Sequence, residues 1–155
     1  MTTSTTTTTR ADIGLTILRV VIGATFAAHG AQKLFVYGFA GVTGAFQGMG
    51  IPLPGLTGPL TGFVELFAGL ALVVGLLTRL AGAGLAITML GAIAFVHVAA
   101  GFFAPTGFEF PLALLAATVA LAFTGAGRFS LDALIASRRS ATAGQQPVRA
   151  LRRAA

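Results

Sequence analysis

Four long apolar segments, separated by short breaks, run through this chain of 155 residues. They cover about 13–35, 56–77, 80–103 and 108–124. Each one approaches the roughly 20 residues that an α-helix needs to cross about 30 Å of hydrocarbon. None of them alternates an apolar stripe with a polar face, as the helices of water-soluble proteins do. The pattern predicts an all-α fold, an integral membrane four-helix bundle.

The low content of charged residues supports a lipid environment. Only 9% of the residues are charged and 55% are hydrophobic, whereas a soluble domain carries about 25% charged residues. A chain of this composition cannot cover a water-facing surface with polar side chains. It also contains no cysteine, which excludes thiol chemistry and iron–sulfur ligation by its own residues.

The basic residues favour a lipid partner over nucleic acid. The formal net charge is +6, and five of the ten basic residues follow Ser137, namely Arg138, Arg139, Arg149, Arg152 and Arg153. This tail offers no recognisable nucleic-acid module. We therefore expect membrane lipid, and in particular anionic lipid, as its partner.

The same residues predict the orientation in the membrane. In a chain that crosses four times, the tail falls on one side together with Arg10, Arg19, Arg79 and Arg128. By the positive-inside rule this side is the cytoplasm. The prediction is an N-in/C-in, multi-pass membrane protein.

The chain divides into three expected parts. Residues 1–11 form a threonine-rich N-terminal tail, which we expect to be disordered. The four-helix transmembrane domain follows over 12–127, with an interfacial loop at 37–55 that holds a short helix near 43–49. Residues 128–155 are expected to form a short C-terminal amphipathic interfacial helix and a basic cytoplasmic tail. In this helix Ser130 is the expected N-cap.

Five ionisable residues are expected to meet in the outer half of the bundle. With a rise of about 1.5 Å per residue, positions near the ends of the first three segments fall at a similar depth. A charged side chain at the bilayer centre costs about 2.5–3.5 kcal/mol on insertion scales, so buried charges need partners. We expect an ion pair between Lys33 and Glu65. The complete candidate cluster is His29, Lys33, Glu65, His97 and, at the outer mouth, Glu109.

Simpler roles remain open for each of these residues. The ion pair could serve only to fix the packing of two helices. The histidines His29 and His97 are expected to be hydrogen-bonded rather than to bind haem or a metal, and no metal site is predicted. We assign Arg19, Arg79 and Arg128 to the inner face and expect Arg19 and Arg79 to snorkel to headgroups.

Several short motifs carry a family likeness. In order they are LRVVIG at 18–23, FAAHGAQKLF at 26–35, GIP at 50–52, ELFAGLALVVGLLTR at 65–79, His97, GFF at 101–103, GFE at 107–109 and GAGRFSLD at 125–132. Together they cover about 13–134, and the chain thereby resembles the DoxX family of small four-helix bacterial membrane proteins. It departs from the family at Ala126, where proline is frequent.

This resemblance implies a role in redox metabolism at the bacterial inner membrane. The family takes its name from a subunit of an archaeal thiosulfate:quinone oxidoreductase, and actinobacterial relatives are implicated in a membrane complex with soluble redox enzymes. The implied function is a membrane subunit of an oxidoreductase complex. The sequence does not identify a cofactor, and a quinone is one candidate ligand for the polar pocket. Soluble redox enzymes on the cytoplasmic side are the implied partners.

Two other functions stay open. A quinone headgroup needs hydrogen-bond donors beside apolar walls, and His29, Lys33 and His97 could supply them. The intramembrane glutamate, lysine and histidines, with Glu65 among them, could instead line a permeation pathway for a small solute or for protons. A third possibility is a non-catalytic membrane anchor that recruits soluble enzymes. The sequence does not decide whether the protein is an enzyme, and it does not give the oligomeric state.

Overall fold

The computed structural model describes residues 4–140, with side chains from residue 9 onward, and this part is all-helical without a β-strand. Its elements in chain order are α1 (Ser4–Ala31), the π-helical η1 (Gln32–Tyr37), α2 (Gly38–Gly48), α3 (Pro54–Val74), α4 (Thr78–Ala92), the π-helical η2 (Ile93–His97), the 3₁₀ turn η3 (Val98–Ala100) and α5 (Glu109–Thr124). A further helix covers 131–140.

Within residues 4–140, three helical stretches are long and apolar enough to cross a membrane. They are Thr9–Gly48, Pro54–Val74 and Thr78–Ala100, and the apolar helix Glu109–Thr124 is shorter. The apolar segments predicted from the sequence therefore coincide with α1 and η1, α3, α4 to η3, and α5. The chain is a membrane protein with transmembrane helices.

Two segments differ from the expectation. The helix α1 begins at Ser4, within the tail that we expected to be disordered, because elongating an existing helix is far easier than nucleating one. In the expected loop at 37–55, α2 is longer than predicted and follows directly on η1 after a bend at Gly38, whose φ is +66°. Residues 1–3, and the part of the basic tail after 140, lie outside the described residues.

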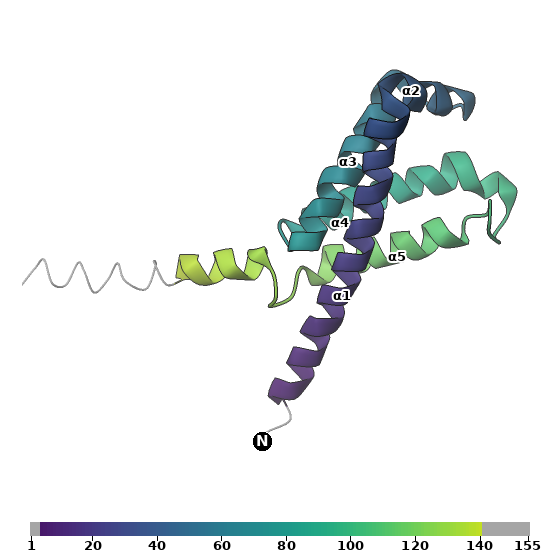
Figure 1. Cartoon of the computed structure of the whole chain (residues 1–155). Coiled ribbons are helices and arrows are strands. Elements are labelled where there is room, and N and C mark those ends of the chain that lie inside the picture. The colour runs from purple at the N-terminus through teal and green to yellow at the C-terminus, as the bar shows by residue number, and fades with distance from the viewer. Residues whose placement is uncertain (1–3, 141–155) are drawn as a thin grey trace, which may run out of the picture.

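The helices form two antiparallel pairs that cross each other. Figure 1 shows α1 and α3 side by side, whereas the hairpin of α4 and α5 lies across this pair. The link between α3 and α4 is short, because Val74 ends one helix and Thr78 begins the next. The two helices meet at this link and diverge away from it (Figure 1).

Glycines allow both pairs to pack closely. A Cβ atom added to Gly30 of α1 would lie 2.3 Å from the Leu66 backbone nitrogen, and one added to Gly69 of α3 would lie 2.5 Å from that of Ala27. In the other pair, a Cβ atom on Gly82 would lie 2.8 Å from the Thr118 carbonyl oxygen. Such close backbone contact is the usual way in which helices pack in lipid.

The buried core is small, and many large apolar side chains point outward. Phe26, Leu72, Leu85 and Leu121 are almost completely buried. Phe35, Leu80, Ile87 and Phe123 are at least 70% exposed. In water such a surface would cause aggregation, but it suits contact with lipid tails.

Candidate functional site

An ion pair between Lys33 and Glu65 joins η1 to α3, as the sequence predicts. The Glu65 side chain is only 4% exposed and that of Lys33 is 23% exposed. Lys33 follows Gly30 by three residues, which returns it to the face of the helix that contacts α3. Gly62 of α3 lies against this segment, because a Cβ atom there would lie 2.8 Å from Cδ2 of the neighbouring Leu34.

A pocket of about 520 Å³ lies between α3 and α4, where these helices diverge, and residues at the end of α2 complete its wall. We call it the α3–α4 pocket. Its lining is apolar or glycine except for Lys33, Thr57, Thr61, Glu65, Thr88 and His97. Residues 57, 61 and 65 are spaced by four, so they form one polar stripe along α3. The ion pair is therefore part of the wall of a mostly apolar cavity.

His97 lines the same pocket but is held by the loop after α4. Its Nδ1 lies 2.8 Å from the carbonyl oxygen of Thr106. It does not contact the ion pair directly through any hydrogen bond among the described residues. Of the five residues in the expected cluster, the structure brings Lys33, Glu65 and His97 to one cavity.

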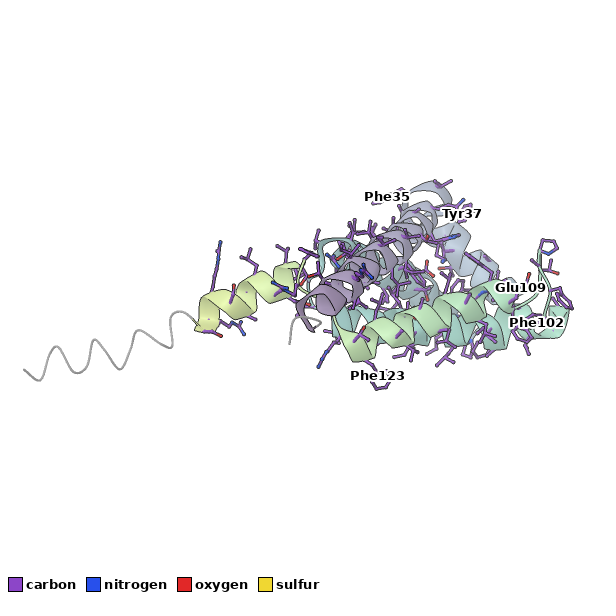
Figure 2. All side chains as sticks on the ribbon, turned by 90° about the horizontal axis from the view of Figure 1, so that it is seen from below. Phe35, Tyr37, Phe102, Glu109 and Phe123 are labelled. Carbon is purple, nitrogen blue, oxygen red and sulfur yellow. The ribbon has the colours of Figure 1, made fainter. Side chains whose placement is uncertain are left out.

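Glu109 does not line the pocket and instead stabilises the loop before α5. Its Oε1 accepts a hydrogen bond of 2.8 Å from the backbone N–H of Ala104. Figure 2 shows Glu109 and Phe102 together at one end of the hairpin, away from Phe35 and Tyr37. The expected convergence assumed four nearly parallel helices. Because the hairpin of α4 and α5 crosses α1 and α3, the end of the hairpin that holds Glu109 lies away from the end of the first pair that holds Phe35 and Tyr37.

His29 also lies outside the α3–α4 pocket, and it is exposed. It immediately precedes Gly30, which contacts α3. Neighbouring residues on an α-helix are about 100° apart, so His29 is rotated off the contact face. The structure therefore does not bring His29 to the α3–α4 pocket with the three residues of the expected cluster that line it.

A second polar cluster surrounds the link between α3 and α4, and we call it the link cluster. Asp132 accepts hydrogen bonds from the backbone N–H groups of Leu77 at 2.8 Å and Thr78 at 3.0 Å. Its own backbone N–H donates to the carbonyl of Gly75 at 2.9 Å. A carboxylate at this position satisfies the first N–H groups of α4 and suits the positive end of its dipole. The helix 131–140 is thereby attached to the link.

Arg19 completes the link cluster from α1. Its Nη1 donates to the carbonyl oxygens of Leu72 at 3.0 Å and Val73 at 2.7 Å, and its Nη2 donates to that of Phe129. The residue is 3% exposed, so it does not snorkel to headgroups as we expected. The reason is that the last carbonyls of α3 have no partner within the helix and attract a cationic donor.

The remaining inner-face arginines, Arg79 and Arg128, are exposed. The backbone N–H of Arg128 donates to Oδ1 of Asp12 at 3.0 Å, and Asp12 is buried. Sequence reasoning missed Asp12 and the role of Asp132 at the link. The chain contains only four acidic residues. Each of them could therefore have been examined as a candidate partner for an arginine or for a helix N-terminus.

The described residues offer no cluster for a metal ion, since no three His, Cys, Asp or Glu side chains among them are grouped suitably. The α3–α4 pocket suits an organic ligand better. Apolar walls with a few placed polar groups are typical of sites for small molecules.

Comparisons with known proteins identify relatives over most of the chain. Residues 14–98 match the family model DoxX, and residues 57–149 match that of the TQO small subunit DoxD. An uncharacterised membrane protein of Mycobacterium tuberculosis is 34% identical over 135 residues, which cover 80% of this chain and 82% of the relative. CatD of Bacillus subtilis, named as a candidate oxidoreductase, is 35% identical over 125 residues, with 80% and 88% covered. No solved structure matches.

Proposed function

Because this chain belongs to the DoxX family of membrane proteins, we propose that it is a membrane subunit of an oxidoreductase complex and binds a lipid-soluble quinone, in either redox form, in the α3–α4 pocket. The observation that carries this proposal is the Lys33–Glu65 ion pair in the wall of a mostly apolar cavity. Ionisable residues within membrane segments are costly and usually functional.

The pocket has the size and chemistry for such a ring. A cavity of about 520 Å³ falls within the range of about 300–1,000 Å³ that is usual for small-molecule sites. Lys33, Glu65 and His97 would contact the polar ring substituents, while Leu60, Ile87 and Phe95 would contact the ring faces and the tail. A bound quinone would supply the electron-transfer chemistry that these side chains lack.

One family model and one relative support the oxidoreductase assignment. One matching family model describes a small subunit, DoxD, and CatD carries an oxidoreductase name. The chain contains no cysteine, so a dithiol or iron–sulfur centre in such a complex would have to come from a partner protein, which favours a subunit role.

We propose four crossings, with both termini in the cytoplasm of a bacterial inner membrane. The helix α5 has 16 residues, or about 24 Å at 1.5 Å per residue, and would cross with the help of its close contact with α4. The exposed arginines Arg79 and Arg128 would then lie on the cytoplasmic side, in accord with the positive-inside rule. In the same orientation, the helix 131–140 would lie at the cytoplasmic interface with its exposed Leu131, Leu134 and Ile135 toward lipid.

The test is retention of quinone by the purified protein. Wild-type protein is reconstituted into nanodiscs that contain quinone, and the bound molecules are released and measured by mass spectrometry. We expect stoichiometric quinone for the wild type and for the control His29→Gln, which lies outside the pocket, and at least a tenfold loss of affinity for Lys33→Met. If the wild type retains no more quinone than empty nanodiscs, the proposal is wrong.

A further inference from the structure

The hydrogen-bond groups in the α3–α4 pocket are unequally divided between donors and acceptors. The three threonines of its lining all use their hydroxyl hydrogen on a backbone carbonyl. Thr57 donates to Pro52 and Leu53, Thr61 donates to Thr57 at 2.7 Å, and Thr88 donates to Leu85 at 2.8 Å. A hydroxyl group whose hydrogen is used offers only its lone pairs to a ligand.

His97 is also an acceptor toward the pocket. A carbonyl oxygen can only accept, so the contact of 2.8 Å between Nδ1 and the Thr106 oxygen places the hydrogen of the neutral imidazole on Nδ1. The other ring nitrogen, Nε2, then carries a lone pair. No hydrogen bond among the described residues uses Nε2, so its lone pair is available to a ligand in the pocket that His97 lines.

The ion pair adds one donor group and one more acceptor. Lys33 uses one of its three N–H donors on Oε2 of Glu65, so it retains donors for a ligand. Glu65 accepts from Lys33 alone among the described residues, and its other carboxylate oxygen remains an acceptor. Lys33 is therefore the single donor side chain in a lining that otherwise offers acceptors.

We infer that the α3–α4 pocket selects a lipid-soluble ring that carries hydroxyl groups, a hydroquinone or a related phenol, over the corresponding quinone. A hydroquinone donates its O–H groups to His97, Glu65 or the threonines and still accepts from Lys33. A quinone has only acceptor oxygens, so Lys33 is the one side chain of the lining that can donate to them. The acceptor groups of His97, Glu65 and the threonines would then have no donor in the ligand. Buried polar groups left without a partner weaken binding.

This inference rests on the proposed function, since it concerns the same cavity. It also corrects the expectation that histidines would donate to a quinone, because His29 lies outside the pocket and the Nδ1 hydrogen of His97 is used by Thr106.

The test compares three ligands with one ring and one ten-carbon tail. They are a decyl benzoquinone, its hydroquinone and the dimethyl ether of that hydroquinone, titrated into nanodisc-embedded protein under anaerobic conditions by calorimetry, with empty nanodiscs as the blank. Two net hydrogen bonds correspond to about a tenfold difference in affinity. We expect the hydroquinone to bind about tenfold more tightly than either the quinone or the ether.

Two variants assign the preference to named acceptors. His97→Phe and Thr61→Val should each reduce the ratio of hydroquinone affinity to ether affinity by about threefold. The ratio isolates the hydrogen bond, because a change in the shape of the cavity acts on both ligands. An unchanged ratio in both variants would overturn the inference. Thr61→Val keeps the test valid if His97→Phe does not fold. Thr25→Val is the matched control, because Thr25 makes the same type of bond to Val21, at 2.9 Å, and lies outside the pocket.

Each outcome has a separate meaning. Equal affinities for the three ligands, or tightest binding of the quinone, overturn the inference and leave a quinone-binding pocket in place. No binding above the blank by any ligand overturns the proposed function itself.

Discussion

Lys33 on η1 donates a hydrogen bond from its ammonium group to the carboxylate of Glu65 on α3, and this ion pair forms part of the wall of the α3–α4 pocket. The ion pair joins the first helical stretch of the chain to α3, on the side of α3 that faces α4 across the pocket. We therefore expect these two residues to contribute both to the stability of the protein and to its proposed ligand binding.

Breaking the pair from one side should destabilise the protein. Lys33→Met leaves the Glu65 carboxylate, which is 4% exposed, without a counter-charge, and we expect a loss of about 2–3 kcal/mol in the free energy of unfolding. The double variant Lys33→Met/Glu65→Gln should recover most of this loss because no unpaired charge remains. Denaturant unfolding in one detergent measures four proteins, namely the wild type, Lys33→Met, Glu65→Gln and the double variant. Additive effects of the two single variants would show that the residues do not interact.

Close packing of α1 against α3 should depend on Gly30. In Gly30→Ala the new Cβ atom would lie 2.3 Å from the backbone nitrogen of Leu66, so the helices must separate, at about 1–3 kcal/mol. Gly14→Ala on the same helix is the control, because nothing lies within 4 Å of its Cβ position. Thermal unfolding should rank Gly30→Ala below the wild type and Gly14→Ala at or above it. Equal behaviour of the two variants would contradict the packing described here.

Asp132 should stabilise the start of α4 from a distant part of the chain. Asp132→Asn keeps one acceptor oxygen of the two that bind Leu77 and Thr78, and we expect it to cost about 1 kcal/mol of stability. Glu109→Gln is the comparison, because Glu109 uses a single oxygen on Ala104 and its amide keeps that acceptor. If both variants are equally stable, Asp132 does not act as a helix cap.

The proposed four crossings can be tested with single cysteines, since the chain has none of its own. Thr106→Cys lies in the loop before α5, and Ser137→Cys lies in the helix 131–140. A membrane-impermeant maleimide should label Thr106→Cys in intact cells and Ser137→Cys only after permeabilisation. Labelling of both from the same side would mean that α5 does not cross the membrane.

The positions of the helices could be predicted from the sequence because lipid-exposed helices need continuous apolar residues. The expected segment at 108–124 matches α5 (Glu109–Thr124), and that at 56–77 matches α3 (Pro54–Val74) closely. The pairing of Lys33 with Glu65 could also be predicted, since each is a charge of opposite sign in an apolar segment and needs a partner.

The relative orientation of the helical pairs could not be predicted in this way. Depth along a helix says nothing about the angle at which the hairpin crosses α1 and α3, and this angle carries Glu109 away from the ion pair. The roles of Arg19 and Asp132 depend on backbone carbonyl groups at the end of α3 and backbone N–H groups at the start of α4. These backbone groups are 53 to 55 residues from Arg19 or Asp132 in the sequence. The sequence alone therefore gives no sign that they are hydrogen-bond partners.

The most direct test of the α3–α4 pocket is to locate a bound quinoid molecule by photolabelling. A quinone analogue with a photoreactive azide is irradiated in the presence of nanodisc-embedded protein, and the modified peptides are identified by mass spectrometry, with excess unmodified hydroquinone as competitor. We predict competable labels within 57–65 of α3 and 84–97 of α4 and η2, and their loss in Lys33→Met. Labels that fall elsewhere, or that the competitor does not reduce, would contradict a binding site at the Lys33–Glu65 ion pair.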